Sequence, residues 1–329
     1  MDKNINISIK AILFAFGLVI GGYIIFRLSN ILGIFAIALL IVFALEPLVK
    51  KLMQLTVLNK KVSRGVAVGF SYLLLIVFLV FVFTMWLPPF ISESQKLIKN
   101  IPKIVNSIQL SDKLELNFSD ILPQTSKISS NLLTASLSVF SNLTTLFSLF
   151  VISLYMSLDW PNIKRRFASL FPDKTEDLVL DTIDEIEVSL GHWLKGESIL
   201  MLVVGTASFV GLLLLDVDYP LSLGLISGFL EVVPMIGPVF SAIIAGIIAL
   251  ADAPIKALGV VILFIIIQQL ENNILVPKVM QKVSGFSPLI ILFALLVGGE
   301  FFGIVGAVLA VPATMILSIV AKKVIRFLR

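Results

Sequence analysis

Long apolar runs recur along the chain and limit the structures that it can form. Each approaches the roughly 20 residues that a helix needs to cross a hydrocarbon core about 30 Å thick. Backbone groups find no partner in lipid, so a spanning segment must be a helix or part of a closed barrel. Barrel strands alternate apolar and polar residues, and these runs do not. They are Ala11–Phe26, Ile31–Leu45, Val66–Leu87, Leu143–Leu158 and Ile199–Leu215.

Composition supports the same class. Hydrophobic residues make up 58% of the 329 residues and charged residues 14%, far from the average of soluble domains. A net charge of +4 is small for this length and indicates loops that face membrane and water rather than nucleic acid. The chain has no cysteine and one histidine, so disulfides and a histidine-based metal cluster are excluded. We expect no cofactor and no metal site.

Basic residues predict the orientation of the chain, because lysine and arginine concentrate in cytoplasmic loops. Basic clusters follow the second and the fourth apolar runs, and another forms the C-terminal tail. All three lie on the same side if the N-terminus is inside, which predicts a multi-pass protein of the cell (inner) membrane with cytoplasmic N- and C-termini. The clusters are Lys50, Lys51, Lys60, Lys61 and Arg64; Lys164, Arg165 and Arg166; and Lys322, Lys323, Arg326 and Arg329.

Three regions are expected along the chain. Apolar residues at helical spacing predict an amphipathic helix over residues 91–109, outside the membrane. Asp173 and Glu176 resemble a capping box and predict a second amphipathic helix, on the inside. The predicted regions are a scaffold of transmembrane helices (1–158) with an outer amphipathic segment (88–138), a cytoplasmic amphipathic linker (159–195) and a transport region with two span-plus-hairpin repeats (196–329).

The first predicted hairpin lies between Pro220 and Leu250. Its two apolar limbs of about 12 residues would each reach only about 18 Å, too short to cross a membrane. Glycine and proline in the stretch EVVPMIGP (231–238) favour a turn, so we expect a re-entrant hairpin that enters and leaves by one face. Two full crossings would leave the C-terminus on the same side, so a fold of eight to ten spans remains the alternative.

A second copy of this pattern follows the span 256–277. Pro288 starts a short limb that breaks at GGEFFGIVG (298–306), and aligning Glu231 with Glu300 also aligns Gly237 with Gly306. One crossing per unit would orient the two units oppositely, and such inverted repeats are typical of secondary transporters. The predicted fold is an all-α polytopic membrane protein with about six full spans plus two re-entrant hairpins and an inverted repeat in the C-terminal half.

Polar side chains interrupt this apolar region in two places. The stretch QQLENNILVPKVM (268–280) begins directly after an apolar run, and its amides and carboxylate would be costly against lipid. We expect these groups to face a water-filled path, the hairpin tips or the inner interface; a polar helix end among lipid headgroups is the alternative. Glu231 and Glu300 are expected to approach one cavity near the midplane, where a carboxyl group can hold and release a proton. The alternative is that they cap hairpin helices.

Five stretches resemble successive motifs of the AI-2E family of bacterial transporters, over nearly the whole chain. They are FALEPLVKKL with Arg64 downstream, HWLKGESILMLVVG, GFLEVVPMIGP, NNILVPKVM and LVGGEFFGIVGAVLAVP. The resemblance implies a homo-oligomeric inner-membrane permease; some members are linked to export of the signal autoinducer-2 and others to sodium–proton antiport. With the family's pattern positions, the candidate substrate or ion pathway comprises Glu231, Pro234, Gly237, Gln268, Glu271, Asn272, Asn273, Pro277, Gly298, Gly299, Glu300, Gly303 and Gly306.

These observations together predict a function in transport. We expect a secondary transporter that works by alternating access in the lipid bilayer, either exporting a small solute such as a signalling molecule or exchanging Na⁺ for H⁺. Intramembrane protease motifs and a phosphate-binding loop are missing from the sequence, so we expect neither an enzyme nor an ATP-driven pump. An oligomeric channel and a non-transporting membrane scaffold are the alternatives.

Overall fold

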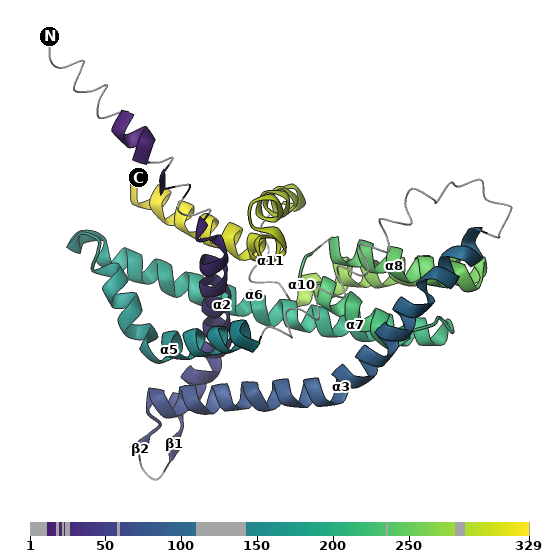
Figure 1. Ribbon diagram of the computed structural model, residues 1–329. Coiled ribbons are helices and arrows are strands. Elements are labelled where there is room, and N and C mark those ends of the chain that lie inside the picture. Colours follow the sequence, from purple (N-terminus) through teal and green to yellow (C-terminus); the bar gives the residue numbers. More distant parts are fainter. Residues whose placement is uncertain are drawn as a thin grey trace.

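The computed structural model shows a protein built of helices (Figure 1). It describes residues 12–17, 20, 21, 23, 27–57, 60–109, 143–234, 236–279 and 287–328. Within that part, the only strands are a two-residue pair, β1 and β2. The elements are α2 (Ser29–Gln54), β1 (Thr56–Val57), β2 (Lys60–Lys61), α3 (Arg64–Gln109), α5 (Leu143–Ala168), α6 (Asp173–Leu214), α7 (Pro220–Leu230), α8 (Ile236–Asp252), α9 (Pro254–Leu270), the π-helical turn η2 (Glu271–Leu275), α10 (Val276–Val279) and α11 (Pro288–Leu328).

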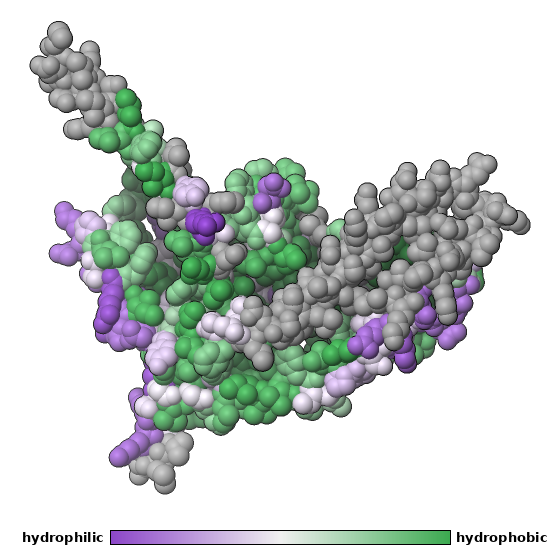
Figure 2. Space-filling view, viewed as in Figure 1, coloured by the Kyte–Doolittle hydropathy of each residue, from purple (hydrophilic) through white to green (hydrophobic). Residues whose placement is uncertain are grey.

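Six of the described helices are long and apolar enough to cross a membrane. Many of their large apolar side chains are exposed, and Figure 2 shows a broad apolar surface such as lipid would cover. The prediction of an all-α polytopic membrane protein is confirmed. The run Ala11–Phe26 lies partly outside the described residues. The six spans are Ile31–Gln54, Arg64–Leu97, Thr144–Ala168, Asp173–Leu214, Pro254–Val279 and Leu289–Leu328.

The third helix, α3, joins a predicted span to the predicted outer amphipathic helix. It has 46 residues and changes direction along its length (Figure 1). Pro88 and Pro89 lie near the middle of its range, and proline bends a helix because it lacks the amide N–H and its ring crowds the preceding turn. The helix predicted over 91–109 is therefore present as the second half of α3. Residues 110–138 of the predicted outer segment lie outside the described residues.

Helices α5 and α6 pack against α2 and against each other. α6 begins at Asp173, as expected, but its N-cap is Pro172 and no side chain caps it. The predicted capping box is therefore wrong; Asp173 and Glu176 lie in the first turn, where acidic side chains interact favourably with the helix dipole. α6 continues for 42 residues to Leu214 without a break, so one helix joins the polar stretch after Ala168 to the apolar span.

Hairpin 1 consists of α7, α8 and the break between them, of which residues 231–234 are described. Gly237 starts the returning helix against the end of α7, and a Cβ atom there would overlap the carbonyl oxygen of Leu230. The open ends of the hairpin lie together, because Lys256 Nζ binds Asp216 Oδ2 at 2.9 Å and Asp252 Oδ2 at 2.7 Å. The chain thus returns to the level at which it entered this hairpin.

Hairpin 2 lies within α11, which bends sharply at Gly303. This residue has φ 61° and ψ −145°, a conformation open essentially to glycine alone. The limbs on either side touch at Gly298 and Gly306, where a Cβ atom on one would overlap the carbonyl oxygen of the other. Gly306 therefore does in hairpin 2 what Gly237 does in hairpin 1, as their alignment in the sequence suggested.

Two large apolar clusters pack these elements, beside a smaller one that joins α2 and α3 around Tyr72. One joins α2, α5, α6 and the returning limb of α11, around Phe43, Trp160 and Leu190. The other joins the end of α6 to α7, α8 and α9, around Leu212 and Phe264. α6 belongs to both clusters, so it connects α2 and α5 to the two hairpins.

Candidate functional site

Three buried carboxyl groups meet where α6, hairpin 1 and η2 come together. Glu197 is on α6, Glu231 follows the last residue of α7, and Glu271 begins η2. Their exposed fractions are 4%, 1% and 5%. Since carboxyl groups are rarely buried without a partner, we call these three residues the carboxyl cluster and take it as the candidate site.

Close helix packing places Glu197 beside Glu231. α6 and α7 run in opposite directions and touch through glycines: a Cβ atom at Gly228 would lie 2.7 Å from the carbonyl oxygen of Met201, and one at Gly205 would lie 3.2 Å from that of Gly224. Small residues permit such an approach of two membrane helices. Glu197 is one turn before Met201 and Glu231 is three residues after Gly228, so the packing brings the two carboxyl groups to the same end of the helix pair.

A wide helical turn carries Glu271. The amide N–H of Val276 donates to the carbonyl oxygen of Glu271, five residues back, which is the hydrogen bond of a π-helix. Pro277 follows directly; it lacks an N–H for the α-helical bond to Asn273 and favours such a local widening. Turns of this type are frequent at functional sites. The polar stretch singled out in the sequence is therefore an interruption of helical geometry as well as of apolar character.

The three carboxyl groups interact with one another. The side chains of Glu231 and Glu271 lie within hydrogen-bonding reach of each other. Glu271 acts electrostatically on Glu197, and Glu197 and Glu271 both act on Glu231. Gln268 Nε2 donates to Glu271 Oε2 at 3.3 Å. Glu231 Oε2 and Glu197 Oε1 are buried and have no hydrogen-bond partner among the described residues. Because an ionised carboxylate cannot donate, the bond between Glu231 and Glu271 requires a proton on one of them.

The remaining predicted residues of the polar stretch face outward. Asn272, Asn273 and Pro277 are exposed, and Asn273 Nδ2 donates to the carbonyl oxygen of Gln269 at 2.9 Å. In hairpin 1, Pro234 is half-buried in the turn and Gly237 is buried. The structure thus brings Glu231, Gln268 and Glu271 together, as expected, and leaves the two asparagines on the surface.

Hairpin 2 presents a different tip. Glu300 and Gly303 are exposed, Gly298 and Gly299 are partly exposed, and Gly306 is buried. The structure does not bring Glu300 into the carboxyl cluster, although its place in the sequence matches that of Glu231. The two glutamates differ in burial. Glu231 is buried against α6 and η2, whereas Glu300, at the tip of hairpin 2, is exposed.

An apolar cavity of about 970 Å³ lies beside hairpin 2, between α2, α5 and both limbs of α11. Gly298 and Gly306 line it, so two of the predicted pathway residues border open space. The polar groups that face it are hydroxyls, such as those of Thr145 and Thr314, and its lining contains no charged residue. The cavity and the carboxyl cluster are therefore chemically distinct.

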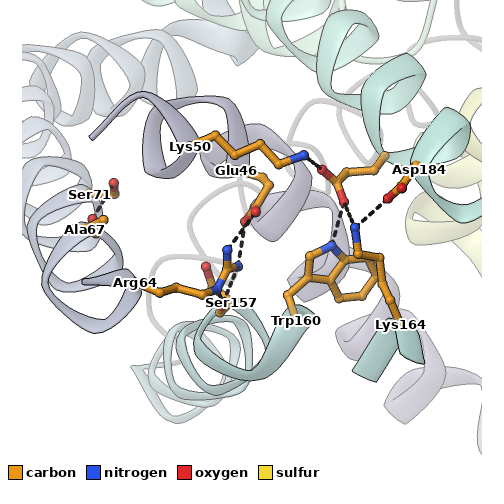
Figure 3. A network of polar contacts seen from close by, with 10 residues as sticks. Glu46, Lys50, Arg64, Ala67, Ser71, Ser157, Trp160, Lys164 and Asp184 are labelled. Carbon is orange, nitrogen blue, oxygen red and sulfur yellow. Dashed lines mark hydrogen bonds and ion pairs between the residues drawn. The ribbon is translucent and has the colours of Figure 1, made fainter. Parts of the chain in front are cut away.

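Ion pairs tie the scaffold helices together at the end where the predicted cytoplasmic clusters gather (Figure 3). Glu187 on α6 accepts from three side chains: Lys50 at 2.5 Å, Trp160 Nε1 at 2.7 Å and Lys164 at 3.1 Å. Lys164 also binds Asp184 at 2.5 Å. These contacts join α2, α5 and α6. Lys323 of α11 adds ion pairs to Asp181 and Glu185 of α6, which connects the end of hairpin 2 to the same helix.

Glu197 is the functional candidate that sequence reasoning missed. It lies in the stretch KGESIL, two residues before an apolar run. A charged residue at this place is normally interpreted as the polar end of a transmembrane span. The available signal was Gly205 downstream, which shares a face with Glu197 about two turns away and marks a close helix contact. That contact and the burial that it causes depend on α7, which is distant in sequence.

Comparison with known proteins identifies the chain. Residues 9–326 match the family model described as AI-2E family transporter. The chain belongs to this family. AI-2E proteins are transport proteins rather than enzymes, and the six apolar helices make this member a multi-pass membrane protein.

Relatives of this AI-2E transporter include YueF of Bacillus subtilis (strain 168), 28% identical over 316 residues, which are 89% of this chain and 84% of YueF. YrrI of the same strain is 36% identical over 175 residues, covering 53% of this chain and 49% of YrrI. TqsA of Escherichia coli (strain K12), named AI-2 transport protein, is 29% identical over 195 residues, covering 58% of this chain and 56% of TqsA.

Proposed function

We propose that this AI-2E transporter is a secondary permease that moves a small solute across the cell membrane by alternating access. The observation that carries the proposal is the carboxyl cluster, which gathers three acidic residues of hairpin 1, η2 and α6 inside an apolar membrane protein. Polar groups at such depth are costly, and in membrane proteins they mark substrate and ion pathways. Broken helices at such a site are typical of secondary transporters.

The arrangement of the two hairpins supports movement between two states. Each turns at a place where only glycine fits, Gly237 in one and Gly303 with Gly306 in the other. Hairpin 1 packs on α6 through glycines, and hairpin 2 borders the open apolar cavity. We propose that both hairpins are re-entrant, that the two units form an inverted repeat, and that residues 196–329 move the solute against a scaffold of residues 1–158.

Two classes of cargo fit this proposal. The name of TqsA favours a small signalling molecule that is exported, and the wholly uncharged lining of the cavity suits a neutral solute. The carboxyl cluster favours exchange of Na⁺ for H⁺, because carboxylates bind both. We propose in addition a homo-oligomer in the inner membrane with both termini in the cytoplasm, which places the ion pairs around Glu187 at the cytoplasmic end.

Flux measured in proteoliposomes tests the proposal. Purified protein is reconstituted with candidate solutes inside, including autoinducer-2, and efflux is followed with and without imposed Na⁺ and pH gradients. A secondary permease is expected to drive the solute against its own gradient when an ion gradient is imposed. Flux that only dissipates the solute gradient would instead establish a channel, and no flux of any solute or ion would establish a non-transporting scaffold.

A further inference from the structure

We propose that Glu197, Glu231 and Glu271 form a proton-binding site, in which Glu231 and Glu271 share a proton and Glu197 is the third carboxyl group that holds it in place. The proposal deepens the proposed function, on which its role in transport rests, by naming the species that the site binds. The site joins three elements of the transport region, so its occupancy depends on how α6, hairpin 1 and η2 pack.

The geometry of the pair requires a proton. The side chains of Glu231 and Glu271 are buried within hydrogen-bonding reach of each other, and two ionised carboxylates would repel there. Gln268 donates to one oxygen of Glu271, which leaves the other side of this carboxyl group for Glu231. Carboxyl pairs that share one proton titrate as a unit, and their members cannot both ionise readily.

Glu197 supplies an independent observation. Its side chain is 4% exposed, and its Oε1 atom has no hydrogen-bond partner within the described chain. Oε2 of Glu231, which is 1% exposed, has none either. Buried polar atoms of native proteins are nearly always satisfied, so two such oxygens in one cluster indicate a ligand that hydrogen-bonds to them. A proton on Glu231 supplies the missing donor, and the ionised carboxylate of Glu197 is then its acceptor.

The charges around the site favour proton binding. Glu271 acts on Glu197, and both act on Glu231; these acidic groups come from α6, from the turn after α7 and from η2. Gln268 of α9 is neutral, and Glu300 of α11 is exposed. None of the ion pairs among the described residues joins a lysine, arginine or histidine to the three carboxyl groups. Three negative charges without a cation in an apolar setting must be neutralised by a bound cation, of which the proton is the smallest.

The arrangement fits a proton better than a metal ion. In the part of the chain described by the structure, no group of three His, Cys, Asp or Glu side chains is arranged to hold a metal. Release of the shared proton to water would add one negative charge to the cluster, and Glu197 opposes that release by repulsion. Glu197 thus tunes how readily the pair gives up its proton.

Infrared spectroscopy of the full-length protein in lipid tests this directly, because a protonated carboxyl group has a C=O stretching band that ionisation removes and D₂O shifts. The wild type is expected to show this band at neutral pH and to lose it as pH rises. Glu231→Gln and Glu271→Gln should each remove the neutral-pH band. Glu197→Gln should move its loss to lower pH, because one negative charge beside the pair is gone; a residue with only a packing role would not shift it.

The control is Asp177→Asn, an exposed carboxyl group on the same helix, α6, which should leave the band unchanged. Variants are compared only when they elute from a sizing column as the wild type does. If one of the three single substitutions prevents folding, the other two still test the proposal. A wild type without the band at neutral pH, or a band that survives in both Glu231→Gln and Glu271→Gln, overturns the proposal. Loss of the band when Na⁺ is added at constant pH would show that Na⁺ displaces the proton, as exchange of Na⁺ for H⁺ requires, and would support the proposal.

The readout needs no transported solute, so the two proposals can fail separately. A titrating band in a protein without flux would refute the permease and leave the proton site standing. Flux with no such band would support the permease and refute the proton site.

Discussion

Glu46 and Arg64 form a two-bond ion pair across the β1–β2 turn. Arg64 Nη1 lies 2.9 Å from Glu46 Oε1 and Arg64 Nη2 lies 2.8 Å from Glu46 Oε2, and Glu46 is 2% exposed. The guanidinium group also donates to the carbonyl oxygen of Ser157, at 3.0 Å from Nε and 2.6 Å from Nη2 (Figure 3). One arginine at the start of α3 therefore holds the end of α2 and the middle of α5.

Replacing Arg64 is expected to destabilise the scaffold strongly. Arg64→Ala leaves a buried carboxylate and a carbonyl group without their donor, and loss of one partner of a buried ion pair costs about 3–5 kcal/mol. Arg64→Lys keeps the charge but loses the paired geometry, so we expect an intermediate effect. Thermal unfolding in detergent measures both. Lys61→Ala, at an exposed position of β2, is the control, and equal melting temperatures for Lys61→Ala and Arg64→Ala would contradict the prediction.

Glu187 and Asp184 test whether burial sets the strength of the ion pairs on α6. Both bind Lys164, but the side chain of Glu187 is 4% exposed and that of Asp184 is 59% exposed. Glu187→Ala removes the acceptor of Lys50, Trp160 and Lys164, and each charged hydrogen bond contributes about 1.5–3 kcal/mol. Asp184→Ala should cost at most about 1 kcal/mol, since solvent screens it. Melting temperatures of the two variants at low and high salt give the comparison; similar losses would show that burial does not decide.

Hairpin 1 should tolerate no side chain at Gly237. A Cβ atom there meets the backbone carbonyl of Leu230, which cannot move without unwinding the end of α7. Gly237→Ala is therefore expected to displace Glu231 from the carboxyl cluster and to abolish flux. Gly246→Ala, in the same helix α8, is the matched control, because nothing lies within 4 Å of its Cβ position. Flux and melting temperature are measured for both, and normal flux in Gly237→Ala would show that the turn does not position the site.

Hairpin 2 allows a similar test of backbone conformation. Gly303 has φ 61° and ψ −145°, so Gly303→Ala should cost about 1–3 kcal/mol through strain alone, with no atom within 4 Å of the new Cβ. Gly299→Ala lies one turn earlier on the helical limb, also in open space, and should be neutral or stabilise by up to about 1 kcal/mol. Thermal unfolding checks both changes. A loss in Gly299→Ala as large as in Gly303→Ala would contradict the assignment of the bend to Gly303.

The sequence allowed the breaks within the two hairpins to be predicted because they depend on local chemistry, whereas the re-entrant course of the hairpins stays a prediction. Glycine and proline at the breaks determine where a helix can reverse, and the alignment of Gly237 with Gly306 succeeded because both occupy a place without room for a side chain. Apolar runs predicted the spans for a similar reason, since lipid leaves no other use for them.

The carboxyl cluster was predicted only in part, because burial depends on contacts between distant segments. Glu231 and Glu300 occupy equivalent places in the two hairpins, yet Glu231 is buried and Glu300 is exposed. Glu197 stands at the edge of an apolar run, and only the packing of α7 on α6 buries it. Periodicity and turn residues contain no information about which hairpin tip other helices will cover.

The two ends of hairpin 1 should lie on the same side of the membrane. Asp216 and Asp252 both bind Lys256, so the chain enters and leaves hairpin 1 at one level, and the predicted orientation makes that level the outer face. A chain without cysteine permits single-cysteine labelling with no background. Cysteines that replace Asp218 and Asp252 should react with an impermeant reagent from outside, and cysteines that replace Thr56, Ser169 and Arg326 only from inside.

Ser169 and Arg326 serve as controls for orientation in that experiment, because Ser169 follows one of the basic clusters that predict the orientation and Arg326 belongs to another. Labelling of positions 218 and 252 from opposite faces would mean that residues 220–252 cross the membrane an odd number of times, which would remove the basis of the inverted repeat. Labelling of both positions from the cytoplasm would agree with a hairpin that enters and leaves by one face, but it would reverse the predicted orientation of the whole chain. Since the ion pairs of Lys256 with Asp216 and Asp252 join the two ends in either orientation, Lys256→Ala should loosen that end and increase the labelling rate at position 218.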